Sequence, residues 1–151
     1  MKVLALNLRN IEYMLDDKLV LAYQRLQKLL EIAEQKPLSE SSIQKLNAKI
    51  EELNTSNKIN GALLSLVQLT ESEIIEIIEQ DSKMVPKGYY SKRWIAIGMS
   101  AIGVPLGLIV GLLMDNIALL AVGIPLGLGI GSLIGKSLDS KAAEEGRQYS
   151  L

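Results

Sequence analysis

The sequence predicts an all-α protein, with an N-terminal cytoplasmic helical domain followed by a two-span transmembrane helical hairpin. Two observations predict this architecture. In the first half of the chain, apolar residues recur at intervals of three and four, which is the period of one helix face. Charge is also unevenly distributed, because residues 1–93 carry 13 basic and 13 acidic side chains whereas residues 94–135 carry only Asp115. An uncharged stretch of that length is typical of membrane segments.

The amino-acid composition argues against several classes of function. The 151 residues include no His, no Cys and no Phe, and their aromatic side chains are five Tyr and one Trp. Without imidazole and thiol groups the chain lacks the usual ligands of metal centres and the usual nucleophile–base pairs, so we expect neither an enzyme nor a cofactor. A formal net charge of −1 and few aromatic rings argue against a nucleic-acid partner.

Residues 1–83 are expected to form the cytoplasmic domain, beginning with a long amphipathic helix. An apolar stripe that includes Leu8, Ile11 and Leu15 predicts that this helix runs from Leu4 to Gln35. The pair Lys36-Pro37 ends it. The apolar stretch near the N-terminus is too short for a signal-peptide core, so we expect no secretory leader.

Three further helices are expected before residue 84. Ser41 and Gln44 form a capping box that opens one of them, which ends at the polar residues 54–57. The apolar run 59–69 favours a helix by its length and leucine content, although a strand is an alternative. Thr70 and Glu73 form another capping box that opens a helix rich in isoleucine, a composition that also suits a strand.

Residues 84–93 are expected to be a juxtamembrane linker. They combine a Pro and a Gly with two tyrosines and three cations, directly before a tryptophan. Tyr and Trp favour the headgroup layer of a bilayer, and Lys and Arg favour its cytoplasmic side. The interface anchors that this pattern predicts, including one cation after the second span, are Tyr89, Tyr90, Lys92, Arg93, Trp94 and Lys136.

Residues 94–136 are expected to form the transmembrane hairpin. Residues 94–114 carry no charge and would extend ~31 Å as a helix, which matches a hydrocarbon core of roughly 30 Å. Asp115-Asn116 supplies the turn, and residues 117–135 form the second span. A buried helix pair in a soluble protein is the alternative, but 93 amphipathic residues offer too little surface to cover two apolar helices.

The charges that flank the two spans predict their orientation. Cations precede the first span and follow the second, whereas the turn has none. The positive-inside rule therefore places both termini in the cytoplasm, with residues 137–151 as a cytoplasmic tail and the hairpin in the cell (inner) membrane.

The two spans repeat each other at an offset of 20 residues. Residues 101–113 match residues 121–133 at eight of 13 positions, and the chain reverses between the copies, as in an inverted repeat. Glycines recur every four residues in both copies and predict close helix packing, either between copies of the chain or within one hairpin. These helix-packing glycines are Gly103, Gly107, Gly111, Gly123, Gly127, Gly131 and Gly135.

Two prolines occupy equivalent positions near the centres of the spans. Pro105 and Pro125 each remove one backbone hydrogen bond, which frees the carbonyls of Ala101 and Ala121. A kink is expected at each proline, acting either as a hinge or as a static bend that is satisfied locally.

The GVPLG and GIPLG copies, the Asp-Asn turn and the tail from Lys136 to Arg147 resemble small bacterial glycine-zipper membrane proteins. The resemblance covers the last third of the chain and implies a homo-oligomer. Two functions remain open. One is a channel-like or membrane-perturbing effector controlled by the cytoplasmic helices, and the other is a membrane-anchored scaffold that recruits a cytoplasmic protein partner through its N-terminal amphipathic helices.

Overall fold

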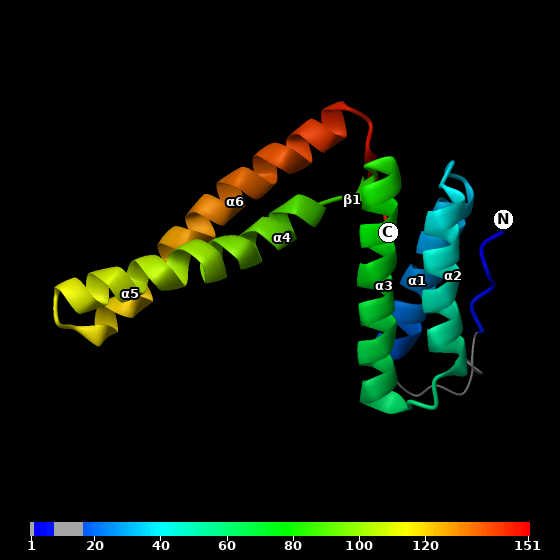
Figure 1. Cartoon of the computed structure of the whole chain (residues 1–151), viewed down its shortest axis with the longest axis horizontal. Coiled ribbons are helices and arrows are strands. Elements are labelled where there is room, and N and C mark those ends of the chain that lie inside the picture. Colours follow the sequence, from blue (N-terminus) through cyan, green and yellow to red (C-terminus); the bar gives the residue numbers. More distant parts are fainter. Residues whose placement is uncertain (1, 8–16) are drawn as a thin grey trace. The chain divides into compact units, whose positions relative to one another are not determined.

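The computed structural model describes residues 2–7 and 17–151, and it confirms the all-α fold with a helical hairpin at the end. Apart from two strands of two residues each, the regular elements of the described residues are helices (Figure 1). The chain divides into two compact units. The first is Met1–Val85 together with Leu151, and the second is Pro86–Ser150.

The first unit contains three helices, α1 (Asp17–Glu34), α2 (Glu40–Thr55) and α3 (Asn60–Ser82). They lie side by side in Figure 1, and both α1 and α2 pack against α3. Each helix buries one apolar face, which is the arrangement that periods of three and four residues produce. The largest fully buried side chains of these helices are Tyr23, Leu26, Leu29, Leu46, Ile50, Leu53, Val67, Ile74 and Ile78.

The prediction that the first helix starts at Leu4 is wrong for residues 4–7, because none of residues 2–7 is helical. Side-chain amides of α2 hold the backbone of this segment instead. Asn47 Oδ1 accepts a hydrogen bond from Leu4 N, and Asn54 Oδ1 accepts one from Asn7 N. Leu8, Ile11 and Leu15, which also belong to the predicted stripe, lie outside the described residues.

The helix α2 begins two residues earlier than its predicted capping box. Its N-cap is Ser39, whose Oγ accepts a hydrogen bond from Ser42 N at 3.3 Å. A contact from another helix fixes this start, because Asp81 Oδ2 on α3 accepts a hydrogen bond from Ser39 N at 2.7 Å. Ser41 therefore lies inside the first turn and is not the cap.

The two helices predicted for residues 59–83 are one continuous helix, α3. Thr70, predicted to cap the second of them, is only 2% exposed and lies in the middle of α3. A capping hydroxyl needs a backbone that leaves the helix, whereas the apolar face here continues from Leu63 through Val67 to Ile78 without a change of register. The strand alternative for the isoleucine-rich run is excluded as well.

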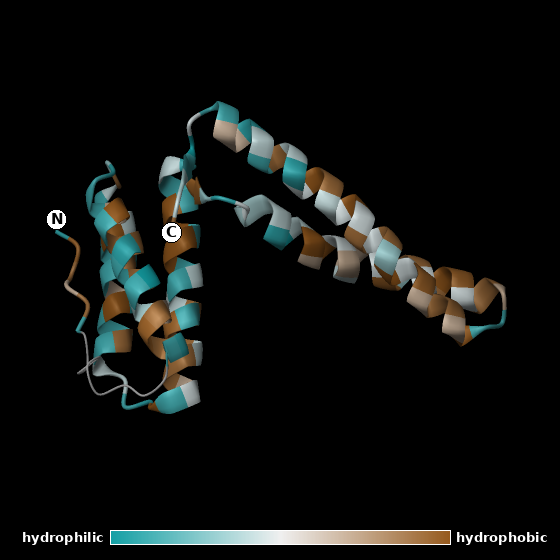
Figure 2. Cartoon of the chain, turned by 180° about the vertical axis from the view of Figure 1, so that it is seen from behind, coloured by the Kyte–Doolittle hydropathy of each residue, from teal (hydrophilic) through white to brown (hydrophobic). Residues whose placement is uncertain are grey.

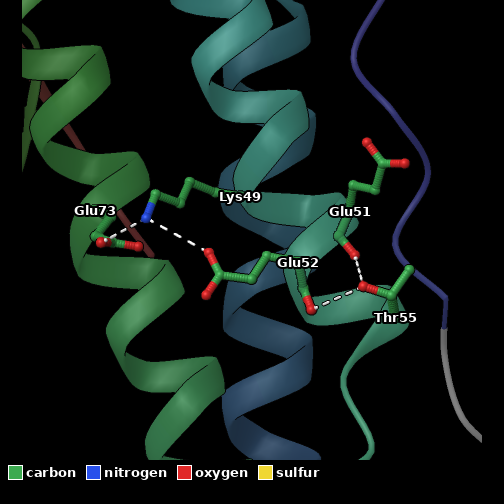
Figure 3. A network of polar contacts seen from close by, with 5 residues as sticks. All are labelled: Lys49, Glu51, Glu52, Thr55 and Glu73. Atoms are coloured by element: carbon green, nitrogen blue, oxygen red, sulfur yellow. Dashed lines mark hydrogen bonds and ion pairs between the residues drawn. The ribbon is translucent and has the colours of Figure 1, made fainter.

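Ion pairs connect α3 to its two neighbours. Glu71, which is 8% exposed, accepts hydrogen bonds from Nε and Nη2 of Arg25 on α1. Figure 3 shows Lys49 of α2 between Glu73 of α3, at 2.9 Å, and Glu52, at 3.6 Å. The hydrogen bond to Glu73 is the main cause that raises the pKa of Lys49 above its usual value. These contacts join α3 to α1 and α2 at the margins of the packed apolar faces.

We expect the first unit to lose stability at acid pH through Asp81. The hydrogen bond from Ser39 N is the main cause that lowers the pKa of this carboxylate in the folded chain. A group with a lowered folded pKa stabilises the fold above its unfolded pKa, near 3.8, and that contribution is lost as the pH falls through the folded pKa. We expect a fragment of residues 1–83 to be soluble and helical. The urea concentration at the midpoint of its unfolding should therefore decrease when the pH is lowered from 6 to 2.5.

The Asp81→Asn variant of that fragment should show a smaller fall in the urea midpoint over the same pH range, since it cannot titrate at this position. Circular dichroism at 222 nm measures the transition. Glu34→Gln, which removes an exposed carboxylate on α1, is the matched control and should behave like the unmodified fragment. An Asp81→Asn profile identical to that of the unmodified fragment would contradict the prediction.

Candidate membrane hairpin

The second unit is built from two helical stretches. In the first, α4 (Tyr89–Ile97), the π-helix η2 (Gly98–Gly103) and α5 (Val104–Leu113) follow one another directly. In the second, the short 3₁₀ helix η3 (Ile117–Leu119) leads into α6 (Leu120–Glu144). Both stretches, Tyr89–Leu113 and Ile117–Glu144, are long and apolar enough to cross a membrane.

Most of this apolar surface faces outward. Only 22% of the most apolar window in the first stretch and 17% in the second is buried. Within the hairpin, Figure 2 shows most of the brown, hydrophobic residues in the half that leads to the closed end, whereas the turn itself is teal. The core helix of a soluble protein would be mostly buried, so this exposure favours a lipid environment.

The two stretches reverse at Asp115-Asn116, where the sequence predicts the turn. Asp115 has a positive φ of 49° and Asn116 N donates a hydrogen bond to Gly111 O at 2.9 Å. The side chain of Asn116 then caps η3 by accepting a hydrogen bond from Ala118 N. A turn this short leaves the two stretches antiparallel and in contact, as the close-contact residues of α5 and α6 show.

The predicted helix-packing glycines lie where the two stretches touch. A Cβ atom added to Gly123 would lie 2.6 Å from Gly107 Cα, and one added to Gly127 would lie 2.7 Å from Gly103 Cα. Real Cβ atoms do not approach backbone that closely, so only glycine fits. Towards the open end, Gly131 meets the backbone of Trp94 and Ile95, and Gly135 meets Ser91. Gly111 packs against Asn116 near the turn.

One more glycine, which the four-residue spacing does not predict, belongs to this contact. A Cβ atom on Gly98 would lie 2.8 Å from Gly131 Cα. Gly98 precedes Gly103 by five residues and so breaks the four-residue spacing. The π-helix explains the break, because its wider turn, with Val104 N donating to Met99 O, brings residues five apart onto the same face.

The two prolines are accommodated differently, although they are equivalent in the repeat. Pro105 lies in the first turn of α5, directly after the π-helix, where its missing N–H removes no α-helical bond of α5. Pro125 lies inside α6, which continues through it. The irregular backbone is thus concentrated in the first stretch, at residues 98–103.

At the open end of the hairpin, α6 caps α4. The carboxylate of Asp139 accepts hydrogen bonds from Tyr90 N at 3.1 Å, Ser91 N at 3.0 Å and Ser91 Oγ at 2.6 Å. A negative charge at a helix N-terminus is favourable, because it satisfies unpaired N–H groups and interacts with the helix dipole. The sequence predicts a tail at Asp139, and no sequence pattern indicates this capping role.

The residues from the end of α6 to Ser150 also belong to the second unit. The strands β1 (Val85–Pro86) and β2 (Gln148–Tyr149) pair, and Lys87 N donates a hydrogen bond to Tyr149 O at 3.0 Å. Gln148 Nε2 donates to Asp139 O. Much of the predicted linker and of the predicted tail is thus helical: α4 starts at Tyr89, and α6 extends to Glu144.

No family model, curated protein or solved structure matches the chain. The resemblance to glycine-zipper membrane proteins therefore stays a prediction.

The predicted interface anchors gather around the open end. The rings of Tyr89 and Tyr90 meet edge to face at 5.3 Å. Arg93 lies 5.8 Å from the centre of the Tyr89 ring and donates a hydrogen bond to its hydroxyl. Trp94 is half-buried, while Lys92 and Lys136 are exposed. Polar tips next to aromatic bodies suit the boundary between lipid and water.

Proposed function

We propose that this chain is an integral membrane protein that acts as a scaffold. Its hairpin crosses the bilayer twice, and the helical domain of residues 1–83 is held in the cytoplasm, where it binds a protein partner. The observation that carries this proposal is the glycine contact within one chain, which turns the apolar side chains outward towards lipid.

The same contact favours the scaffold over a channel-like assembly through the glycines. Each of the seven predicted glycines already meets backbone of its own chain, so a zipper between copies would first have to open the hairpin. The outward faces offer little to line a pore, since the Ser100 hydroxyl is bonded to Ala96 O. For association of copies through the hairpin, exposed apolar residues such as Leu126 and Leu133 are available instead.

A flux measurement separates these two functions. With the purified chain in liposomes, we expect no ion flux above that of empty liposomes, because the hairpin provides no hydrated path. The mass of the detergent-extracted particle gives its stoichiometry in the same preparation. A flux that Gly127→Leu abolishes would support the channel-like effector and contradict the scaffold.

Topology tests the membrane part of the proposal. Since the chain has no cysteine, single-cysteine variants report one position each. An impermeant maleimide should label Asn116→Cys in intact spheroplasts, and should label Leu151→Cys only after lysis, because cations flank the open end and not the turn. The reverse labelling pattern would invert the orientation, and release of the chain by alkaline carbonate would contradict membrane insertion.

A further inference from the structure

Residues 2–7 are attached to α2 in the way that a peptide ligand is held. The amide of Asn47 accepts from Leu4 N at 2.8 Å and donates to Lys2 O at 3.0 Å. The amide of Asn54 accepts from Asn7 N at 2.8 Å and donates to Ala5 O at 3.1 Å. Each side chain thus pairs with one N–H and one C=O of the segment, as a neighbouring β-strand would.

The spacing of the two asparagines matches an extended chain. Asn47 and Asn54 are seven residues apart, which is two turns of helix or ~10.5 Å along α2. Their partners are three residues apart in the segment, and three extended residues span about 10 Å. The two amides therefore repeat at the same interval as the backbone groups that they bind, and no feature of the segment's side chains enters these four bonds.

The other wall of this groove is α1. Residues Val3 to Leu6 line a pocket together with Leu30, Glu31 and Glu34 of α1. Val3 and Leu6 are half-buried, whereas Leu4 is 44% exposed. Two aliphatic side chains of the segment, three residues apart, are thus partly covered, and two carboxylates of α1 line the same pocket. Figure 1 shows the segment running beside α2.

We propose that the groove between α1 and α2 is a binding site for an extended, aliphatic peptide segment of a partner protein, and that residues 2–7 fill it in cis. Binding through main-chain groups gives affinity with limited dependence on sequence, while the two half-buried positions select aliphatic side chains. The segment of the same chain competes at a high effective concentration, so a partner must displace it. As the scaffold's partner site the groove rests on the proposed function, but peptide binding itself does not require that the hairpin crosses a membrane.

The test uses the full chain in detergent micelles with residues 2–7 deleted. The probe is a fluorescein-labelled peptide with the sequence of residues 2–7. Its binding is measured by fluorescence anisotropy, with empty micelles as the blank. We expect saturable binding to the deletion variant, and binding weaker by at least about tenfold to the undeleted chain, where the cis segment occupies the groove. Equal binding to both chains, or none to the deletion variant, would overturn the proposal.

Variants of the deletion chain test the two amides. Asn47→Ala with Asn54→Ala should weaken probe binding by at least about tenfold, since two bonds are lost at each position. Gln68→Ala removes an exposed amide of α3 and is the matched control, with no change expected. Circular dichroism verifies that each variant keeps its helices. Unchanged binding by the double variant with its helices intact would overturn the proposal.

A modified probe gives a readout that does not depend on folding of the variants. N-methylation at the residues equivalent to Leu4 and Asn7 removes the two N–H donors and should weaken binding by about tenfold or more, whereas N-methylation at Leu6 leaves all four bonds in place. Equal effects of the two modifications would overturn the proposal that the amides of Asn47 and Asn54 hold the peptide backbone. A pull-down tests the other occupant. If the immobilised deletion chain binds the full-length chain, and this binding needs Asn47 and Asn54, the occupant is a second copy, which overturns the assignment to a partner protein.

Discussion

Gly127→Leu is expected to separate the two stretches of the hairpin. Any side chain at this position meets the carbonyl of Gly98 and the Cα of Gly103, the latter at 2.7 Å for the Cβ alone. Backbone cannot rotate away as a flexible side chain can, so the helices must move apart towards the roughly 8–10 Å axis separation of helices packed through ordinary side chains. Gly107→Leu should act in the same way, because it meets the backbone of Leu120.

Pairs of nitroxide labels measure this separation. Met99 and Leu133 are both exposed in the hairpin and can each be replaced by a nitroxide-labelled cysteine. Electron–electron double resonance should show a longer and broader distribution of the distance between the two labels in Gly127→Leu than in the parent. Gly129→Leu is a close control, since it adds the same side chain two residues away, where an added Cβ meets no other part of the chain within 4 Å beyond the adjacent turns of its own helix. An unchanged distribution in Gly127→Leu, or equal broadening in Gly129→Leu, would contradict the glycine contact.

The effect on assembly bears on the scaffold. Since the glycines are used within the chain, Gly127→Leu should alter hairpin packing before it alters stoichiometry. If the extracted particle instead dissociates while the label distance stays fixed, the stripe acts between copies, and the function proposed above would have to change.

The hairpin could be predicted from the sequence because it depends on composition that is local in the chain. Length without charge, the Asp-Asn turn and the four-residue glycine spacing are all visible within residues 94–136. The sequence left open whether the glycines pack within one chain or between copies, since both uses need the same spacing. Gly98 could not be predicted as a packing glycine, because a π-helix changes the number of residues per turn and helix propensities do not indicate where a π-helix forms.

The errors in the first unit have a different origin, because they come from contacts between residues far apart in the sequence. Residues 2–7 have a helix-compatible apolar pattern, yet amides more than 40 residues away hold them extended. The start of α2 is fixed by Asp81, 42 residues from Ser39. Thr70 satisfies the capping pattern and is nevertheless buried within α3. Local patterns locate apolar faces, but only tertiary contacts decide where each helix begins.

Ile74→Ala is expected to destabilise the first unit strongly. Ile74 has no exposed surface and lies on the face of α3 that packs against α1 and α2. Removing three buried carbon atoms from a packed core costs about 2–5 kcal/mol, because the neighbours close the cavity only in part. That loss is a large share of the roughly 5–15 kcal/mol that separates most folded domains from their unfolded state.

Hydrogen exchange of α3 amides in the full chain measures this loss without removing the hairpin. At about 1.4 kcal/mol per tenfold, the slowest amides of α3 should exchange at least about thirtyfold faster in Ile74→Ala. Leu69→Ala makes a similar truncation on the same helix at a position that is 55% exposed, and should change exchange little, within about 0.5 kcal/mol. Equal acceleration by both substitutions would show that α3 does not bury the face containing Ile74, and that the three-helix core is packed differently.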